Sequence, residues 1–166
     1  MLRHGCFGFT LTELLIVLAI IALLALSGSG RMGELAARSH QNTAISTITS
    51  TLDRARAHSV TRGVQIGVCL ADSAAHCTSD WSGVEILTFV DSNRNGQRDV
   101  GEEEIFREPM SYPGLKLRWS GFQDYLVYTP DGSAPSNGTL YFDTTAGLTI
   151  AALILSKSGR VRLTRE

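Results

Sequence analysis

The sequence offers little that would support catalysis or a bound metal. Its three cysteines and four histidines are too few, and too scattered along 166 residues, to suggest a zinc site. No nucleophile motif, no G-x-x-x-x-G-K-[ST] phosphate-binding loop and no cluster of metal ligands at a suitable spacing occurs in the chain. We therefore expect a protein that is not an enzyme and that holds no cofactor.

The chain also lacks a dominant charge. It has 16 acidic and 15 basic residues, for a formal net charge of −1, so no overall field selects a nucleic acid or an acidic surface as a partner. Any electrostatic recognition must come from a local arrangement of charges. The length suits one domain of ordinary size plus an appendage.

The main apolar run lies near the amino terminus. Residues 9–26 are apolar almost throughout, and 18 residues of helix extend about 27 Å, which just reaches the lower limit for a bilayer core of about 30 Å. Glu13 stands inside this run, although a charge at the centre of a membrane helix costs roughly 2.5–3.5 kcal/mol. A secretory signal cleaved after about Ser27 and an uncleaved signal anchor are both open interpretations, but neither accounts for Glu13.

The segment GFTLTELLIVLAIIALLA resembles the processing and assembly segment of type IV prepilins and type II secretion pseudopilins. The resemblance implies that a prepilin peptidase removes residues 1–8 by cutting after Gly8, and that the new amino terminus, Phe9, is methylated. It also implies that residues 9–26 form a transmembrane and assembly helix, in which Glu13 pairs with the amino-terminal nitrogen of a neighbouring subunit. Because a buried charge is tolerated when it has a partner, Glu13 is interpreted as an assembly residue.

The sequence after this run predicts an α+β, pilin-like fold. Residues 27–63 are expected to form a joint, interrupted by the glycines of SGSG, and then the amphipathic second half of the helix. In many pilins a proline stands where this chain has Gly30, and a flexible or locally melted joint is the expected substitute. The apolar stripe of this half consists of Ile45, Ile48, Leu52 and Ala55. Its basic residues are expected on a solvated face, or else in contact with other subunits: Arg54, Arg56, His58 and Arg62.

Residues 64–166 are expected to form an antiparallel β domain on which the helix packs. Turn residues separate seven strand-like runs: 64–70, 84–90, 115–119, 125–129, 139–142, 148–155 and 160–164.

Several stretches after residue 26, including LDRARAHSVTRG and LSKSGRVRL, resemble minor pilins of the FimT/GspH type. The resemblance implies a single-pass protein of the bacterial inner membrane, whose carboxyl-terminal domain lies in the periplasm and which joins other subunits in a pilus or pseudopilus. Two functions stay open. One is a type IV pilus subunit that contributes to assembly and binds DNA for uptake in natural transformation. The other is a structural, GspH-like pseudopilin of a type II secretion system.

The cysteines fit a periplasmic location. Cys6 lies in the expected leader, which leaves Cys69 and Cys77 in a compartment where disulfides persist. A disulfide is favoured over two free thiols, and a metal site that adds His76 is a third alternative. Members of the resembling family often carry a second cysteine pair near the carboxyl end, but this chain has no cysteine after Cys77.

The stretch DSNRNGQRDVGE matches the ligand spacing of an EF-hand-type calcium loop. Strand-like flanks and the charges of Arg94 and Arg98 argue against calcium, so a hairpin turn held by Asx hydrogen bonds is the favoured interpretation. The calcium site stays an alternative. Its ligands would be Asp91, Asn93, Asn95, Asp99 and Glu102, with Gly96 at the sharp turn.

The carboxyl end is locally basic. In a strand, Arg160 and Arg162 share one face about 6.7 Å apart, and Gly159 permits a tight turn before them. Two guanidinium groups on one face suit a phosphate backbone. In FimT-like minor pilins a G-R-x-R arrangement is associated with DNA binding, so the resemblance implies that Gly159, Arg160 and Arg162 bind double-stranded DNA.

Further contacts could come from Lys157 and Arg165, and Lys116 and Arg118 could extend the patch, although the sequence does not place the last two beside it. The alternative interpretation is an edge strand that positive charge protects from aggregation.

The pairing role of Glu13 is testable in assembled fibres. Glu13→Ala should leave cleavage after Gly8 intact and impair incorporation, because removing one member of a buried pair costs roughly 3–5 kcal/mol. Immunoblots of whole cells and of sheared pili measure the two steps separately. Normal recovery of the variant in sheared pili would contradict the pairing.

Overall fold

The computed structural model describes residues 10–78, 81, 83–110, 112, 114–121, 123 and 125–165. Its internal contacts divide the chain into two units, Met1–Arg38 and Ser39–Glu166, and each unit is described by itself. The elements are α1 (Leu11–Arg62), β1 (Ile66–Ala71), β2 (Glu85–Val90), β3 (Glu104–Pro109), β4 (Leu115–Gly121), β5 (Leu126–Tyr128), β6 (Gly138–Thr144), β7 (Thr149–Leu155) and β8 (Val161–Arg165).

In the first unit α1 begins after a capping threonine. The Thr10 hydroxyl accepts a hydrogen bond from the Glu13 backbone N–H at 3.3 Å, which satisfies one of the free donors at the helix start. Glu13 therefore lies in the first turn, where the helix dipole favours a negative charge. Large apolar side chains of this segment are exposed, among them Leu14, Ile16 and Leu23.

Among the helices that the structure describes, none combines the length and the apolar character needed to cross a membrane. The transmembrane role of residues 9–26 therefore stays a prediction.

The helix is continuous through the SGSG stretch. Residues 27–30 are helical, as part of the 52-residue α1, so the expected interruption at this point is wrong for the backbone. Two glycines cost about 1 kcal/mol each relative to alanine, but long helical segments flank them, and propagating a helix is far easier than nucleating one. The helix ends at Arg62, and the next residue, Gly63, has a φ of 64°, a left-handed conformation that glycine adopts readily.

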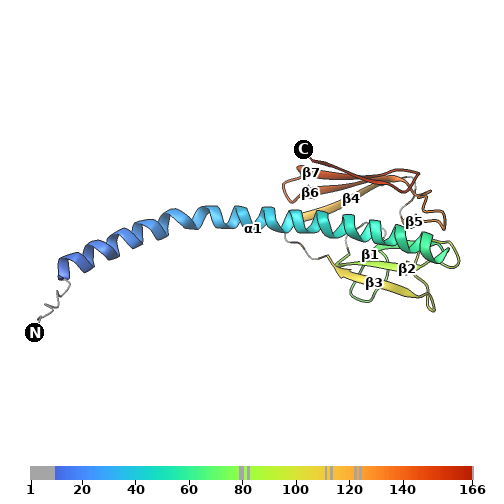
Figure 1. Cartoon of the computed structure of the whole chain (residues 1–166), viewed down its shortest axis with the longest axis horizontal. Coiled ribbons are helices and arrows are strands. Elements are labelled where there is room, and N and C mark those ends of the chain that lie inside the picture. Colours follow the sequence, from blue (N-terminus) through green and yellow to red (C-terminus); the bar gives the residue numbers. More distant parts are fainter. Residues whose placement is uncertain are drawn as a thin grey trace, which may run out of the picture. The chain divides into compact units, whose positions relative to one another are not determined.

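The second unit contains two antiparallel sheets that flank the second half of α1. Sheet A has the strand order β3-β2-β1-β5 and sheet B has the order β4-β6-β7-β8. Figure 1 shows β4, β6 and β7 on one side of the helix and β1, β2 and β3 on the other. The expectation of an α+β, pilin-like fold is confirmed, and seven of the eight strands correspond to the predicted runs.

The hydrophobic core lies where the helix meets both sheets. The predicted stripe is confirmed, because Ile45, Ile48, Leu52 and Ala55 are all buried. Sheet A contributes side chains such as Val68 and Leu126, and sheet B contributes Leu140, Phe142, Leu153 and Leu155. Fully burying one such aliphatic or aromatic side chain contributes roughly 1.5–3 kcal/mol.

Strand β3 is absent from the predicted runs because its sequence, EIFREP, is rich in charge. Its charged side chains have partners in this structure. Arg54 of α1 forms an ion pair with Glu108 at 2.7 Å and stacks over the Phe106 ring at 4.0 Å. Arg62 pairs with Glu103, the residue directly before β3, at 2.7 Å. Both arginines remain exposed, as expected for a solvated face. Their ion pairs also attach the helix to β3 and to the residue before it.

The predicted disulfide is present in the structure. Cys69 on β1 and Cys77 are bonded, with their Cα atoms 5.5 Å apart. The loop that they close covers a small second cluster of buried residues, which includes Leu87 and Phe89. This cluster is separate from the main core, so the bond secures a part of sheet A that the helix does not cover.

Removal of the disulfide should destabilise the protein measurably. The double variant Cys69→Ala/Cys77→Ala should unfold with a free energy about 2–3 kcal/mol lower than the oxidised wild type, as the chain-entropy model gives for a loop of this size. Urea denaturation followed by tryptophan fluorescence measures the difference. The reduced wild type is the matched control and should approach the double variant. Equal stability of all three forms would show that the bond is dispensable.

Candidate functional site

The basic carboxyl end forms a turn followed by an edge strand. Lys157 lies in the turn between β7 and β8, Arg160 directly precedes β8, and Arg162 and Arg165 lie in it. All four side chains are exposed, and none forms an ion pair with a carboxylate of the described residues. Since β8 pairs only with β7, these cations line a free edge of sheet B.

The register of β8 separates Arg165 from the other arginines. Val161, Leu163 and Arg165 lie opposite the buried residues of β7, whereas Arg162 lies opposite the exposed Ile154. Side chains alternate along a strand, so Arg162, and by continuation Arg160, point away from the core. Arg165 instead lines a groove beside α1, of about 340 Å³, together with Leu163, Asn42, Ile45, Ser46, Thr49, Ser50 and Asp53. The predicted DNA-binding set is therefore divided between two faces.

Gly159 has a structural part in this turn. It is buried, with a φ of 76°, and a Cβ atom at this position would collide with the Gly132 carbonyl oxygen. Only glycine combines this left-handed backbone with so close an approach. The predicted role of Gly159 as a DNA contact stays untested, but its position in the fold explains why glycine is needed directly before Arg160.

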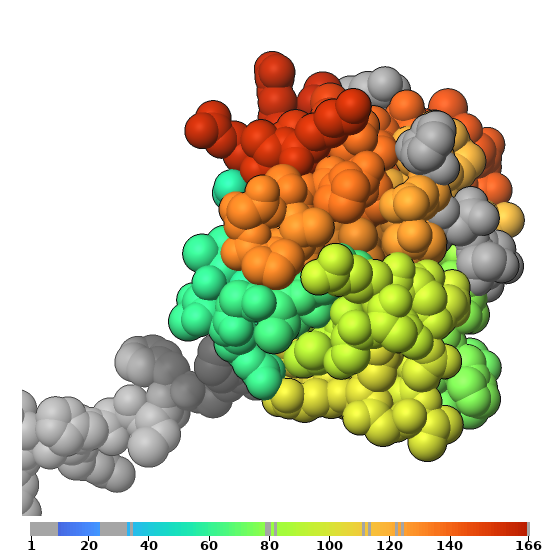
Figure 2. Space-filling model, turned by 90° about the vertical axis from the view of Figure 1, so that its right-hand side faces the viewer, coloured from blue at the N-terminus to red at the C-terminus, as the bar shows by residue number. Residues whose placement is uncertain are grey.

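Arg56 of α1 holds the basic turn in place. Its Nε donates to the Gly132 carbonyl and its Nη2 donates to the Ser158 carbonyl, each at 3.0 Å. The turn also closes on itself, because the Ser156 N–H donates to the Arg160 carbonyl at 3.0 Å. Figure 2 views this end of the molecule, where the red segment of residues 156–165 and the orange segment that includes residues 129–134 lie together near the green end of α1.

Sequence reasoning did not find this role of Arg56. The two carbonyl groups that Arg56 binds are 76 and 102 residues away along the chain, and a backbone carbonyl leaves no signature in a sequence. The residue was expected on a solvated face, and this expectation is wrong.

The neighbouring turn at residues 129–134 carries a carboxylate. Asp131 accepts hydrogen bonds from the Thr129 hydroxyl and from the backbone and side chain of Ser133. These bonds, led by that of Thr129, lower the pKa of Asp131 to about 2. Asp131 is therefore charged at neutral pH, and it supplies one negative charge to the turn on which the basic segment packs.

The loop between β2 and β3, proposed above as a calcium site or a hairpin turn, is held by its own hydrogen bonds. The buried Asp91 accepts from the backbone N–H groups of Asn95 and Gly96 at 3.1 and 3.0 Å. The side-chain amides of Asn93 and Asn95 both donate to Asp99, at 2.6 and 2.7 Å. The oxygens that a calcium ion would need thus serve as acceptors within the loop. This geometry fits the hairpin held by Asx hydrogen bonds.

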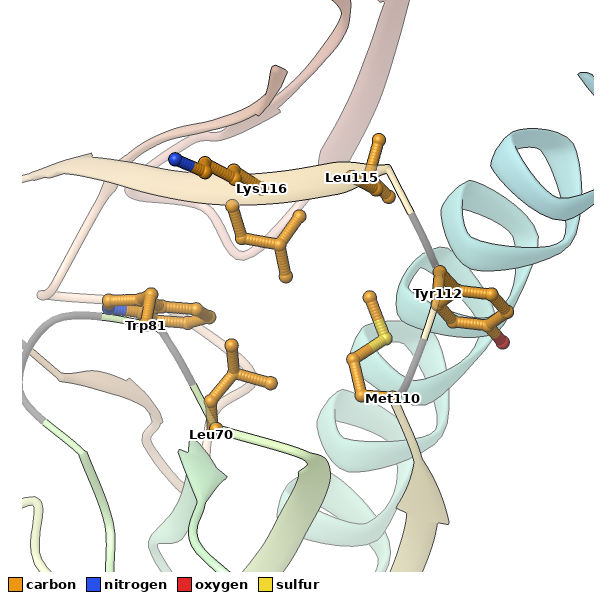
Figure 3. Close-up of a pocket in the computed structure, with 8 residues that line it drawn as sticks. Leu70, Trp81, Met110, Tyr112, Leu115 and Lys116 are labelled. Carbon is orange, nitrogen blue, oxygen red and sulfur yellow. The ribbon is translucent and has the colours of Figure 1, made fainter. Parts of the chain in front are cut away.

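A recess of about 410 Å³ lies between the two sheets. Figure 3 shows Leu70 and Trp81 on one side of it, Leu115 of β4 on the other, and Met110 and Tyr112 next to α1. The Tyr112 hydroxyl hydrogen-bonds with Thr47 at 3.3 Å. Apart from Tyr112 and Lys116, the described lining residues are apolar or glycine, so the recess has the character of an incompletely filled core.

The amino-terminal site residues are only partly visible. Gly8 and Phe9 lie outside the described residues, so their roles in processing stay predictions. Glu13 is exposed in the first turn of α1, which leaves its carboxylate accessible to a neighbouring subunit.

Two family models match the chain. The model of the type II transport protein GspH matches residues 44–159. The model of the prokaryotic N-terminal methylation motif matches residues 3–29, a range that contains Gly8, Phe9 and Glu13. No curated protein gives a significant sequence match.

Two solved structures have a similar fold. The type IV minor pilin FimU of Pseudomonas aeruginosa is 19% identical, and the match covers 76% of this chain and 90% of FimU with a TM-score of 0.56. The minor pseudopilin EpsH from the type II secretion system of Vibrio cholerae is 11% identical, and the match covers 76% of this chain and 96% of EpsH with a TM-score of 0.53. At these identities the likeness is one of fold, and it extends equally to a pilus subunit and to a secretion subunit.

The GspH model covers more than half of the chain, and the methylation motif precedes it in the order that the sequence analysis predicted. By their descriptions, one of the two solved relatives is a type IV minor pilin and the other is a minor pseudopilin. The chain therefore belongs to the GspH family and is a minor pilin or pseudopilin of the FimT/GspH type.

Proposed function

We propose that this protein is a minor subunit of a type IV pilus that contributes to pilus assembly and binds double-stranded DNA without sequence preference, for uptake in natural transformation. The observation that carries the proposal is the free basic edge of sheet B. Arg160 and Arg162 are exposed there on one face, and neither pairs with a carboxylate of the described chain. Guanidinium groups in this position are available to phosphate oxygens.

The mode of binding follows from the number of cations. Lys157, Arg160 and Arg162 supply two or three phosphate contacts, which imply a salt slope of only about −2 to −3. No base-reading helix or ribbon is involved, so the affinity is the same for unrelated sequences. Each copy binds weakly, and useful capture needs several copies or additional basic subunits, because linked sites gain affinity through avidity.

The family membership supports the remaining parts of this proposal. A prepilin peptidase cuts after Gly8 and methylates Phe9, residues 9–26 anchor the subunit in the bacterial inner membrane, and residues 64–166 lie in the periplasm until assembly. The exposed apolar side chains of the first unit and the accessible Glu13 suit packing against the equivalent segments of other pilin subunits.

A second candidate is a structural, GspH-like pseudopilin of a type II secretion system. The match to the GspH model favours it. The fold of this chain is also about as similar to that of EpsH, with a TM-score of 0.53, as to that of FimU, with a TM-score of 0.56. In this case the arginines of β8 serve as protection of a free edge against aggregation. Deletion phenotypes separate the two candidates, because loss of transformation indicates the pilus and loss of secretion indicates the pseudopilus.

Binding of DNA by the purified full-length protein tests the pilus proposal. The oxidised chain in non-ionic detergent is titrated into labelled duplexes of unrelated sequence at 50 and 200 mM salt. We expect weak, sequence-independent binding that weakens roughly 10- to 60-fold between the two salt concentrations, as two or three phosphate contacts predict. Arg160→Ala/Arg162→Ala should abolish most of it.

The matched control is Arg94→Asn, which removes one exposed positive charge from the β2–β3 loop of sheet A and keeps a residue that tolerates the φ of 63° found there. This variant should bind like the wild type. Absence of binding, or binding that the double variant retains, would reject the DNA proposal and leave the secretion subunit.

A further inference from the structure

The outer face of sheet B, which points away from the core, is basic at both of its edges. On β4 the half-buried residues Leu115, Leu117 and Trp119 pack against the core. The residues between them, Lys116 and Arg118, are exposed on the opposite side. Lys116 and Arg118 therefore occupy the same outer face as Arg160 and Arg162, at the other end of the strand order β4-β6-β7-β8.

The register across the sheet aligns the two edges in rows. One row runs from Arg118 through Tyr141 and Ala152 to Thr164, and the next runs from Ser120 through Thr139 and Ile154 to Arg162. Neighbouring strands lie about 4.8 Å apart, so three strand spacings separate the two edges by about 14 Å. Arg118 and Arg162 lie in adjacent rows and are also offset by about 6.7 Å along the strands. Small or uncharged side chains fill the space between them.

A single carboxylate of the described outer face offsets this charge. Asp143 on β6 accepts from the Arg118 Nε at 3.0 Å and from the Thr149 hydroxyl at 2.7 Å. The Thr149 bond, followed by that of Arg118, holds the pKa of Asp143 below its usual range, so the group is charged at neutral pH. Arg118 also stacks over the Tyr141 ring at 4.2 Å. Lys116 has no ion-pair partner among the described carboxylates, and Figure 3 shows its side chain lying along β4.

We propose that Lys116 and Arg118 form a second phosphate-binding edge, so that duplex DNA crosses the outer face of sheet B and contacts β8 and β4 together, with Asp143 limiting the affinity. The proposal rests on the DNA-binding function proposed above. It adds one or two phosphate contacts to the two or three counted there, so the salt slope of the wild type becomes steeper by about 0.9 for each added contact. It assigns phosphate contacts to two residues that lie 39 or more positions before Lys157 in the sequence.

The dimensions of the duplex allow this arrangement. DNA carries one negative charge for about every 1.7 Å of its axis when both strands are counted, so about 14 Å of duplex carries roughly eight phosphate charges. Only the phosphates on the side toward the protein can reach the sheet, and this spacing allows a straight duplex to offer a phosphate to each edge. The residues between the edges, such as Thr139 and Ala152, carry no bulky charged group that would hold the duplex away.

Removal of Asp143 gives a test that misfolding cannot imitate, because the expected result is a gain. Asp143→Asn keeps an oxygen that accepts the Thr149 hydroxyl and releases the Arg118 guanidinium from its ion pair. The variant should bind duplex DNA severalfold more tightly than the wild type at 50 mM salt. Its salt slope should be steeper by about 0.9, the value for one added phosphate contact.

Removal of Lys116 gives the converse test, in the same full-length protein and with the same duplexes. Lys116→Ala should bind DNA more weakly than the wild type, and the difference should be greater at 50 mM than at 200 mM salt. The loss of one phosphate contact predicts that the ratio of wild-type to variant affinity is about 3.5-fold larger at the lower salt concentration. Lys116→Arg keeps the charge and should restore the wild-type affinity. The control Arg94→Asn should match the wild type at both concentrations.

The outcomes separate this proposal from the one on which it depends. If the wild type binds through Arg160 and Arg162, while Asp143→Asn and Lys116→Ala behave like the wild type, the second edge is rejected and the DNA-binding function stands. If the wild type does not bind, or binds equally well without Arg160 and Arg162, the proposed function fails and the second edge fails with it. A gain in Asp143→Asn together with a loss in Lys116→Ala supports a face that uses both edges.

Discussion

Burial of the narrow apolar stripe of α1 is the constraint on which the second unit depends. Each four-stranded sheet has an apolar face that packs against α1 in the main core. Ile45, Ile48, Leu52 and Ala55 fill the space that both faces share. Because one helix packs against two sheets, its rotation about its own axis is fixed. The residues that flank the stripe therefore contact particular residues of the β domain.

The flanking arginines show the consequence of that fixed rotation. Arg54 and Arg62 reach β3, where they meet carboxylates and an aromatic ring. Arg56 points the other way and binds the carbonyl groups of Gly132 and Ser158. The orientation of the basic turn thus depends on the same helix that organises the core, although the turn itself is exposed. One side chain therefore couples the buried stripe to the position of an exposed basic turn.

The fold does not decide between the two functions because the differences lie outside the core. A pilus subunit and a secretion subunit both need a helix that assembles with its copies and a β domain that keeps its sheets covered. The charges of an outer sheet face contribute almost nothing to that packing and are free to differ. In this chain they are concentrated on the two edge strands of sheet B, β4 and β8, so the physical case for DNA binding rests on surface chemistry and not on architecture.

The sequence by itself determined the features that depend on local pattern. These include the apolar stripe, seven of the eight strands, the disulfide partners and the offsets of Gly8, Phe9 and Glu13. It missed β3, whose charged residues look unlike a strand until α1 supplies their partners, and it predicted a break at residues 27–30 where the flanking helical segments carry the backbone through. Tertiary structure alone decided which basic residues share a face. Alternation along a strand defines two faces, but only the neighbouring elements determine which of the two is buried. Strand pairing therefore places Arg165 and Arg162 on different faces of sheet B, and it places Lys116 and Arg118 on the same outer face as Arg162.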